Sequence, residues 1–270
     1  PGRGGYDDMP TLLKRLESYI ALWQNPKTEL NHLRCKMLNT CIEAGCKPKG
    51  IYTLTVPTGG GKTVTSLAFA LHHAVTHGMK RVIYIIPYTS IIEQNAEVFR
   101  NILGSGNVLE HHSGMEFDLS DGASPEEIRR ALASENWDMP VVVTTAARFF
   151  DSLYANRSSK CRKLHSLANS VIIFDEAQML PLCHLRPCVA AMASLAEYVG
   201  STLVLCTATQ PSLSDLLCTY APGHTVMELC PQTEEIYDRF RRVTFRQAGV
   251  LEDDALTERL SNHRQVLCVV

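Results

Sequence analysis

Three consecutive glycines followed by a lysine and a threonine, at residues 59–63, constrain this chain more than any other stretch of its sequence. An apolar, β-branched run over residues 51–56 precedes them and a helical pattern follows, which predicts a strand, a tight loop and a helix in that order. Glycine backbone can close around phosphate oxygens, and the N-terminus of the next helix attracts negative charge. The stretch is therefore predicted to be a phosphate-binding loop.

Individual residues of this loop have separate expected roles. Lys62 is expected to reach the β- and γ-phosphates of a nucleotide, and the Thr63 hydroxyl to take Mg²⁺. The strict motif would have its first glycine at position 56, where this chain has Val56, a departure that argues against kinases and small GTPases. An ordinary turn with a chance glycine run is the weaker alternative. The residues predicted to hold the nucleotide are Thr58, Gly59, Gly60, Gly61, Lys62 and Thr63.

Two adjacent carboxylates, Asp175 and Glu176, follow the apolar run at residues 171–174. Asp175 is expected to hold Mg²⁺, through water, while Glu176 orients and activates the water that attacks the γ-phosphate. Acidic pairs at strand ends are common, so this pair alone would be moderate evidence. Together with the glycine loop, and with two candidate strands between them, it predicts a nucleotide-hydrolysing site.

Apolar strands alternate with helical patterns over most of the chain, the spacing typical of βαβ units and a parallel sheet. Their continuous Val, Ile and Leu character suits strands that helices cover on both faces. Residues 104–139 are expected to be a less regular insertion, with a surface loop and short helices near 117–127. The candidate strands are 51–56, 81–86, 140–143, 171–174 and 202–206, and amphipathic helices are expected at 9–23 and 27–46.

Polar residues follow several of the candidate strands, at the edge where ligands bind in such sheets. After residues 81–86, Thr89 or Ser90 is expected to cap a helix, with Tyr88 at the working edge of the sheet. A capped helix with a packed tyrosine and a nucleic-acid backbone contact are equally good interpretations of this stretch. Residues 111–114 and 144–149 have the same character, so three polar strand exits favour the nucleic-acid interpretation.

Composition indicates an ordinary globular protein, with 45% hydrophobic residues, 20% charged residues and a formal net charge of −2. This charge is only weak evidence against nucleic-acid binding, because a local groove and backbone amides can hold phosphates. Ten cysteines without a C-x-x-C pair, a signal peptide or a membrane-spanning run predict reduced thiols in a cytoplasmic protein. No protein-ligated metal site is assigned, because the candidate groups lack a full ligand set: Cys35, Cys41 and Cys46; His73 and His77; Cys183, His184 and Cys188.

Four motifs in a fixed order resemble the helicase part of the CRISPR-associated helicase–nuclease of type I interference systems, a superfamily two helicase. They occupy residues 57–63, 87–95, 174–181 and 207–211, and the resemblance covers about 31–270. The first and third motifs are shared by the wider superfamily, whereas the second and the stretch 144–181 are more particular to this family. In the acidic motif Gln178 stands where the superfamily more often has Asp or His, a change that some members of this family share.

The resemblance implies an α/β, RecA-like P-loop NTPase domain, with a mostly parallel sheet flanked by helices on both faces. It implies an ATP-driven, 3′-to-5′ translocase on single-stranded DNA, recruited by a guide-RNA surveillance complex after R-loop formation for antiviral defence, with ATP and Mg²⁺ as cofactors. The catalytic set would be Lys62, Asp175, Glu176 and Gln178, with Thr63 and Asp175 at the Mg²⁺. Nucleic-acid contacts would be Tyr88, Thr89, Gln94, Ser113, Thr144 and Thr145, and coupling residues Thr207 and Thr209. Gln24 or Arg34 would be candidates for an adenine contact, with a solvated helix face as the alternative.

The expected domains are lead-in helices at 1–50, a first RecA-like domain at 51–222, a connecting segment at 223–264, and the first strand of a truncated second RecA-like domain at 265–270. The chain has no His-Asp dipeptide, so the family's HD nuclease is expected to be absent as well. Because the arginine finger would come from the second domain, weak nucleotide binding and poor turnover are expected. An RNA helicase or other superfamily two remodeller is one alternative. The other is a nucleotide-responsive docking scaffold, against which the complete hydrolytic set argues.

Overall fold

The computed structural model describes residues 4–115, 124–207, 213–231, 233–240, 243–244 and 247–268. It divides into two compact units, Pro1–Phe240 and Arg241–Val270. The first unit contains a seven-stranded sheet in the order β3-β4-β2-β5-β6-β1-β7, and every neighbouring pair of strands is parallel. Its strands are β1 Ile51–Thr55, β2 Arg81–Ile86, β3 Val108–His111, β4 Val141–Thr145, β5 Ser170–Phe174, β6 Thr202–Thr207 and β7 Val226–Glu228. The predicted α/β fold with a parallel sheet is confirmed.

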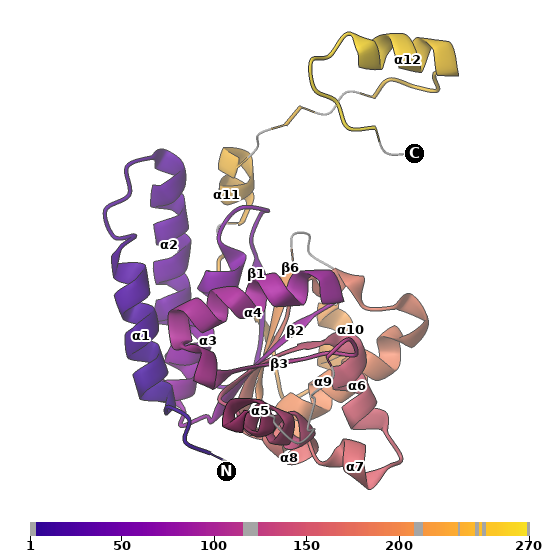
Figure 1. Ribbon diagram of the computed structural model, residues 1–270. Helices are drawn as coiled ribbons and strands as arrows, with labels where there is room; N and C mark the ends of the chain where they lie inside the picture. Colours follow the sequence, from indigo (N-terminus) through magenta and orange to yellow (C-terminus); the bar gives the residue numbers. More distant parts are fainter. Residues whose placement is uncertain are drawn as a thin grey trace. The chain divides into compact units, whose positions relative to one another are not determined.

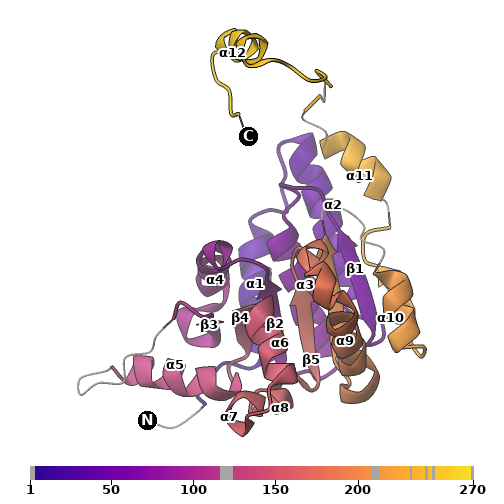
Figure 2. The ribbon, with the colours of Figure 1, turned by 90° about the vertical axis from the view of Figure 1, so that its right-hand side faces the viewer.

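Helices cover both faces of this sheet, as the continuous apolar character of the strands predicted (Figures 1 and 2). One face packs against α1 Met9–Ala21, α2 Glu29–Ala44, α3 Lys62–Thr76 and α4 Thr89–Leu103. The other face packs against α5 Pro125–Asn136, α6 Ala146–Tyr154, α8 Leu164–Leu167, α9 Leu185–Val199 and α10 Ser214–Tyr220. Alternate strand residues enter the two cores: in β2, Val82 and Tyr84 face the first helical layer, and Ile83 and Ile85 the second.

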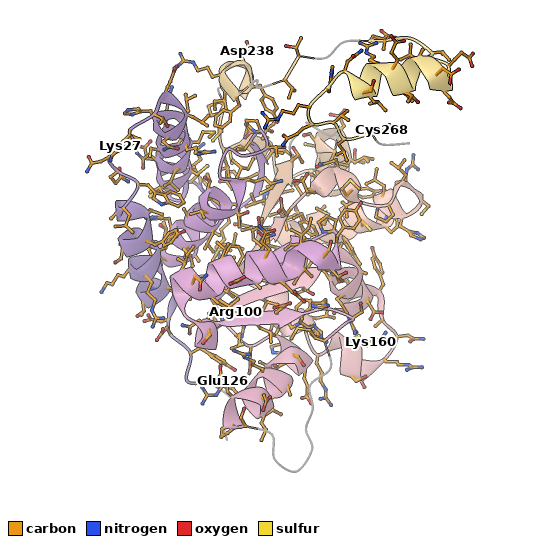
Figure 3. All side chains as sticks on the ribbon, turned by 45° about the horizontal axis from the view of Figure 1, so that its top comes forward. Lys27, Arg100, Glu126, Lys160, Asp238 and Cys268 are labelled. Atoms are coloured by element: carbon orange, nitrogen blue, oxygen red, sulfur yellow. The ribbon has the colours of Figure 1, made fainter. Side chains whose placement is uncertain are left out.

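The five strands expected from apolar runs all form, within two residues of their predicted ends. The expectation of an irregular insertion at 104–139 was incomplete, because it contains β3 at one edge of the sheet and α5. β3 has four residues and includes the buried carboxylate Glu110, which is ion-paired with Arg100 (labelled in Figure 3). Such a short strand with a charged residue has little apolar pattern to detect. Most of the surface loop expected at 117–127 lies outside the described residues.

Strand order determines where the chain's polar loops meet. β1 lies between β6 and β7, whereas β2, the next long strand in sequence, lies between β4 and β5. The crossover through α3 therefore passes over β6 and β5, and the carboxyl ends of β1, β6 and β5 lie next to one another. In parallel sheets ligands bind beyond the carboxyl ends of the strands.

Residues 223–240, expected to belong to a connecting segment, lie in the first unit. β7 joins the main sheet beside β1, and α11 Thr233–Phe240 contributes Ile236 and Phe240 to the core near α2. In the second unit, α12 Asp253–Ser261 has no buried residue. The strand expected at 265–270 is not formed over 265–268, where Leu267 is 87% exposed and no described strand lies alongside; residues 269–270 are outside the described part. Among the described residues, no helix is both long and apolar enough to cross a membrane.

Candidate nucleotide-binding site

The glycine loop between β1 and α3 adopts a conformation that only glycine tolerates well. Gly59 and Gly61 have φ angles of +82° and +88°, and the Gly60 N–H donates to the Pro57 carbonyl at 2.9 Å. A Cβ atom on Gly60 would collide with Val56 Cγ1. The backbone therefore turns closely on itself just before the N-terminus of α3, as expected for a phosphate cradle.

Val56, the departure from the strict motif, is a packing residue of this loop. Its side chain is buried, and its N–H donates to the Thr207 carbonyl at 3.2 Å. This bond fixes the start of the loop to the end of β6. The valine thus replaces a glycine at a position where the chain needs apolar contact.

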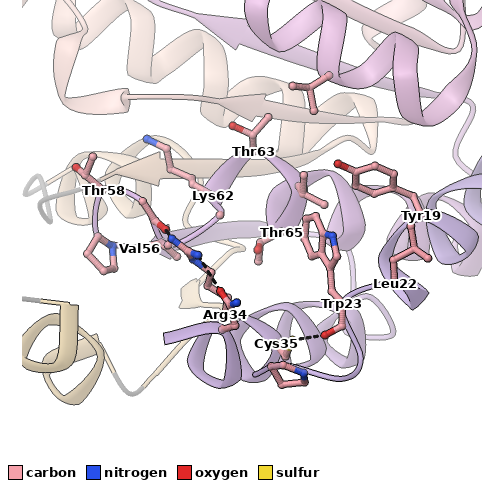
Figure 4. Close-up of a pocket in the computed structure, with 18 of the residues that line it drawn as sticks. Tyr19, Leu22, Trp23, Arg34, Cys35, Val56, Thr58, Lys62, Thr63 and Thr65 are labelled. Atoms are coloured by element: carbon pink, nitrogen blue, oxygen red, sulfur yellow. Dashed lines mark hydrogen bonds between the residues drawn. The ribbon is translucent and has the colours of Figure 1, made fainter. Parts of the chain in front are cut away.

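Arg34 on α2 holds the loop from the outside (Figure 4). Its Nε and Nη2 atoms both donate to the Gly59 carbonyl, at 2.9 and 2.6 Å, and Nη1 donates to Asn31 Oδ1 at 2.9 Å. Arg34 is therefore not a freely solvated side chain. It ties the lead-in helices to the glycine loop, a role that the sequence pattern did not indicate.

The structure brings Lys62, Asp175 and Glu176 together. Lys62 Nζ lies 2.8 Å from Asp175 Oδ1 and also contacts Glu176 Oε1. Burial favours the neutral amine, but the charges of Asp175 and Glu176 outweigh it and raise the pKa of Lys62 above its ordinary value. The loop lysine and both carboxylates after β5 thus share one cluster.

Glu176 has a left-handed backbone conformation, with φ +49°, which is uncommon for a non-glycine residue. Its N–H donates to Asp175 Oδ1 at 3.0 Å, and Gln178 Nε2 donates to Glu176 Oε2. Gln178 Oε1 is buried and has no hydrogen-bond partner among the described residues. All four side chains predicted to be catalytic are therefore connected, and the free amide oxygen of Gln178 can accept a further donor.

Thr63 has a partner that the sequence analysis missed. Its hydroxyl donates to Asn95 Oδ1 on α4 at 3.2 Å. Asn95 is a polar residue on the buried side of α4, among the apolar residues Ile92, Ala96 and Phe99. A polar residue interrupting the apolar face of a predicted helix is the signal that would have identified it.

A pocket of about 850 Å³ opens beside the loop. It is lined by residues 56–65 and Glu176, and on its other side by α1, α2 and the turn between them, including Tyr19, Trp23 and Arg34 (Figure 4). Gln24 is not among the described residues that line it. The pocket's size is in the range of small-molecule sites. The N–H groups of the glycine loop and the Lys62 ammonium suit the phosphates of a nucleoside triphosphate. The Thr63 hydroxyl and the nearby carboxylates suit Mg²⁺.

Most residues predicted to contact nucleic acid lie at the exits of β2, β3 and β4, which are neighbours in the sheet, and Gln94 lies on α4. The side chains of Tyr88, Thr89, Gln94 and Ser113 are exposed. Tyr88 is the N-cap residue of α4, and no side chain caps this helix, so the capping expected of Thr89 or Ser90 is not found.

Unlike these four exposed side chains, those of Thr144 and Thr145 are buried. Thr144 is fully buried, and its hydroxyl donates to the His111 carbonyl at 2.7 Å. Thr145 is also buried, and its hydroxyl accepts from the Arg148 N–H at 3.2 Å, which caps α6. The Thr144 side chain therefore joins β3 and β4, and its contact with nucleic acid stays a prediction.

Of the two residues predicted to couple nucleotide and nucleic acid, the structure describes only Thr207. Thr207, the last residue of β6, is buried and pairs with Thr55 across β1 and β6, so it lies beside the strand that leads into the glycine loop. Thr209 lies outside the described residues.

Comparisons with known proteins identify relatives among helicases. The family described as "DEAD/DEAH box helicase" matches residues 39–216, more than half of the chain. The CRISPR-associated nuclease/helicase Cas3 of Haloferax volcanii is 27% identical over 255 residues, covering 80% of this chain and 27% of that protein. This confirms the predicted resemblance.

Solved structures show the same fold. The T. fusca Cas3–ATP crystal structure has a TM-score of 0.59 and 17% identity, covering 78% of this chain and 24% of that one. The DUF1998 helicase MrfA bound to DNA has a TM-score of 0.56 and 13% identity, covering 85% and 30%. The chain thus spans about a quarter to a third of the length of these relatives. It contains a RecA-like, helicase-type ATP-binding domain related to Cas3, and it belongs to the DEAD/DEAH box helicase family.

Proposed function

We propose that this chain binds ATP in the pocket beside the glycine loop and hydrolyses it as the first motor domain of a translocase on single-stranded DNA. The observation that carries this proposal is the cluster of Lys62, Asp175 and Glu176 directly against a loop that only glycines can form. A docking scaffold would not require both carboxylates beside the loop lysine.

The chain's own residues supply the chemistry. Backbone N–H groups of residues 59–63 bind the phosphates, and Lys62 exchanges a carboxylate contact for a phosphate oxygen. Thr63 and Asp175 are the residues that would hold Mg²⁺, which when bound neutralises charge on the phosphates. Glu176 orients the attacking water and accepts its proton. The adenine base of the nucleotide lies toward α1 and α2, beside Arg34.

The nucleic-acid part of the proposal rests on the similarity to Cas3 and on the exposed polar residues at the exits of β2 and β3. Its proposed setting is CRISPR type I interference in the cytoplasm, with 3′-to-5′ movement along the strand displaced by a guide-RNA complex. A second helicase domain and an HD nuclease domain would be its partners. An RNA substrate is the competing possibility that the experiment below separates.

The test is ATP hydrolysis by this chain with no nucleic acid, with single-stranded DNA, and with RNA of the same sequence, using Lys62→Ala as the blank. Glu176→Gln keeps the shape of the carboxylate but removes its basicity. It is expected to retain binding of a fluorescent ATP analogue while lowering turnover by about 100-fold or more. Turnover by the chain alone is expected to be slow and to rise when the second helicase domain is added.

Three results would contradict the proposal. Undiminished turnover by Glu176→Gln would remove Glu176 from the chemistry. Stimulation by RNA and not by DNA would support an RNA helicase. If neither nucleic acid changes the rate, even with the second domain present, the translocase assignment is wrong and only ATP binding remains.

A further inference from the structure

Two of the chain's cysteines meet inside the first unit, although they are 189 residues apart in sequence. Cys41 is on α2 and Cys230 follows β7, and their sulfur atoms lie 3.6 Å apart. Both residues are buried, and both are free thiols. Among the described residues, no other two cysteine sulfurs are hydrogen-bonded to each other. The fold therefore places two thiols in contact where the sequence has no paired motif.

The surroundings of Cys230 hold it against α2. Its N–H donates to Glu228 Oε1 at 3.0 Å, and Glu228 Oε2 accepts from the Thr55 hydroxyl at 2.8 Å. Its sulfur also lies 4.0 Å from the Met37 carbonyl oxygen, one turn before Cys41. A disulfide bond is about 2.0 Å long, so the two sulfurs need to approach each other by about 1.6 Å. Rotation of the two side chains supplies a change of this size.

A small pocket leads to one of the two sulfurs. It has a volume of about 210 Å³ and is lined by residues of α2, of α11 and of the segment after β7, including Leu33, Met37, Cys230 and Ile236. Cys41 is not among the described residues that line it. α2 and α11 lie side by side at this place (Figures 1 and 2). The pocket is mostly apolar and smaller than a drug-sized site, so it suits a small aliphatic molecule.

The two thiols are not equivalent as nucleophiles. The hydrogen bond with Cys230 and burial raise the pKa of the Cys41 thiol well above its ordinary value. Because the thiolate is the reactive form, Cys41 is a poor first attacker. Cys230 is the thiol that a molecule in the pocket meets. Cys230 is therefore suited to attack first, and Cys41 to complete the bond.

We propose that Cys41 and Cys230 form a redox-sensitive pair, which a small aliphatic disulfide converts into an intramolecular disulfide bond. The Cys230 thiolate attacks one sulfur of the reagent, and the other sulfur leaves with the electron pair of the broken bond and takes up a proton. Cys41 then attacks the Cys230 sulfur of this mixed disulfide, and its proton goes to the second leaving thiolate. Two thiols of the chain are oxidised, and one disulfide reagent is reduced to two thiols. This proposal goes beyond the proposed function and does not depend on it.

The new bond would join two supports of the glycine loop. Arg34, on the same helix as Cys41, donates to the Gly59 carbonyl at 2.6 Å. On the other side, Glu228 holds Thr55, the last residue of β1 before the loop. A cross-link between residues so distant in sequence strongly restricts the unfolded chain. The oxidised chain is therefore expected to be more stable, while none of its catalytic side chains is altered.

The test treats the whole folded chain with hydroxyethyl disulfide, blocks the remaining thiols with iodoacetamide and maps the peptides by mass spectrometry. Two peptides joined through Cys41 and Cys230, which dithiothreitol separates, are expected. The thermal midpoint of the oxidised chain is expected to rise by about 5–15 °C. The matched control, Cys46→Ser, removes an exposed cysteine just beyond α2 and is expected to give the same cross-link and the same rise.

Single substitutions test the order of attack. In Cys41→Ser, Cys230 is expected to accumulate the mixed disulfide with the hydroxyethyl thiol, because no second thiol displaces it. In Cys230→Ser, Cys41 is expected to stay unmodified, because it is fully buried and outside the pocket lining. Neither variant is expected to show the rise in thermal midpoint. Thermal unfolding of the untreated variants checks that they fold.

Three results would overturn the proposal. Absence of the link between Cys41 and Cys230 in the parent chain would mean that the two thiols do not react, and this result does not depend on any variant. Links from either cysteine to other cysteines in equal yield would mean that oxidation follows unfolding. Modification of Cys41 in Cys230→Ser would remove the assigned order of attack. Failure here leaves the ATP assay with Lys62→Ala and Glu176→Gln unaffected, so it can be told from failure of the proposed function.

Discussion

At the scale of single residues, one close contact constrains the glycine loop at position 60. Gly60 lies against the side chain of Val56, the residue that stands where the strict motif has a glycine. The bulk that the strict motif lacks at position 56 is therefore accommodated at position 60. The two positions should behave as a pair, because the space that one side chain occupies is the space that the other must leave free.

Gly60→Ala is expected to weaken ATP binding strongly, because its Cβ would collide with Val56 Cγ1 and approach the Pro57 carbonyl to 3.0 Å. The double change Val56→Ala/Gly60→Ala is expected to recover part of the affinity, since it removes the colliding methyl groups. Titration with a fluorescent ATP analogue measures both. Val56→Ala alone is the control and is expected to lose about 0.5–3 kcal/mol of stability while still binding ATP. Equal ATP affinities for Gly60→Ala and Val56→Ala/Gly60→Ala would contradict the coupling of positions 56 and 60.

The sequence predicted the chemistry of this site better than its supports. Lys62, Asp175 and Glu176 were predicted because their residue types and order are required by the reaction. The contacts by which Arg34 and Asn95 support the site were not predicted, because their partners are a carbonyl and a hydroxyl distant in sequence. Thr144 was expected near the nucleic acid, and the sequence could not show that its hydroxyl bonds to a neighbouring strand.

At the scale of elements, one carboxylate adds side-chain hydrogen bonds to the backbone pairing of the short strand β7 with β1. Glu228 Oε1 accepts from the N–H groups of Thr55 and Cys230, at 3.1 and 3.0 Å, and Oε2 accepts from the Thr55 hydroxyl at 2.8 Å. Thr55 is buried and is the last residue before the glycine loop turns. Glu228 therefore satisfies buried donors at the point where the edge strand meets the site.

Glu228→Ala is expected to lower the free energy of unfolding by about 1–3 kcal/mol, because it leaves buried donors of Thr55 without a partner. Glu228→Gln retains one acceptor oxygen and is expected to lose less. Urea unfolding followed by circular dichroism measures both. A Glu228→Ala protein as stable as the parent chain would mean that water replaces the carboxylate at no cost.

The strands that the sequence predicted are those with a long run of apolar residues. The apolar runs of β1, β2, β4, β5 and β6 are strand signals in themselves. β3 and β7 are short, and each includes a glutamate, the buried Glu110 and the partly buried Glu228, whose partners lie elsewhere in the fold. No local pattern shows that such partners exist.

At the scale of the whole molecule, the expected parallel sheet already implied that the glycine loop, the acidic pair and the polar exits share one edge. What the sequence could not give was the order of strands, which places β1, β6 and β5 together on one side and β2, β4 and β3 on the other. That order separates the nucleotide cluster from the exits that continue into α6. It also determines where the first unit ends, since β7 and α11 complete its sheet and core.

The first unit ends at Phe240 in the structure, whereas the sequence analysis ended the domain at residue 222. Truncated chains test which of these two boundaries is right. A chain ending at Phe240 is expected to keep the thermal midpoint of the whole chain and its ATP affinity, because the described residues after it include no buried side chain. A chain ending at residue 222 loses the buried Leu229, Cys230 and Ile236 together with the carboxylate on Thr55. Each buried apolar side chain of this kind is worth about 1.5–3 kcal/mol, so the shorter chain is expected to unfold several degrees lower or not to fold. Calorimetry on the three chains decides between them. Equal midpoints for all three would restore the boundary at 222, and a fall already at Phe240 would mean that residues 241–270 stabilise the first unit.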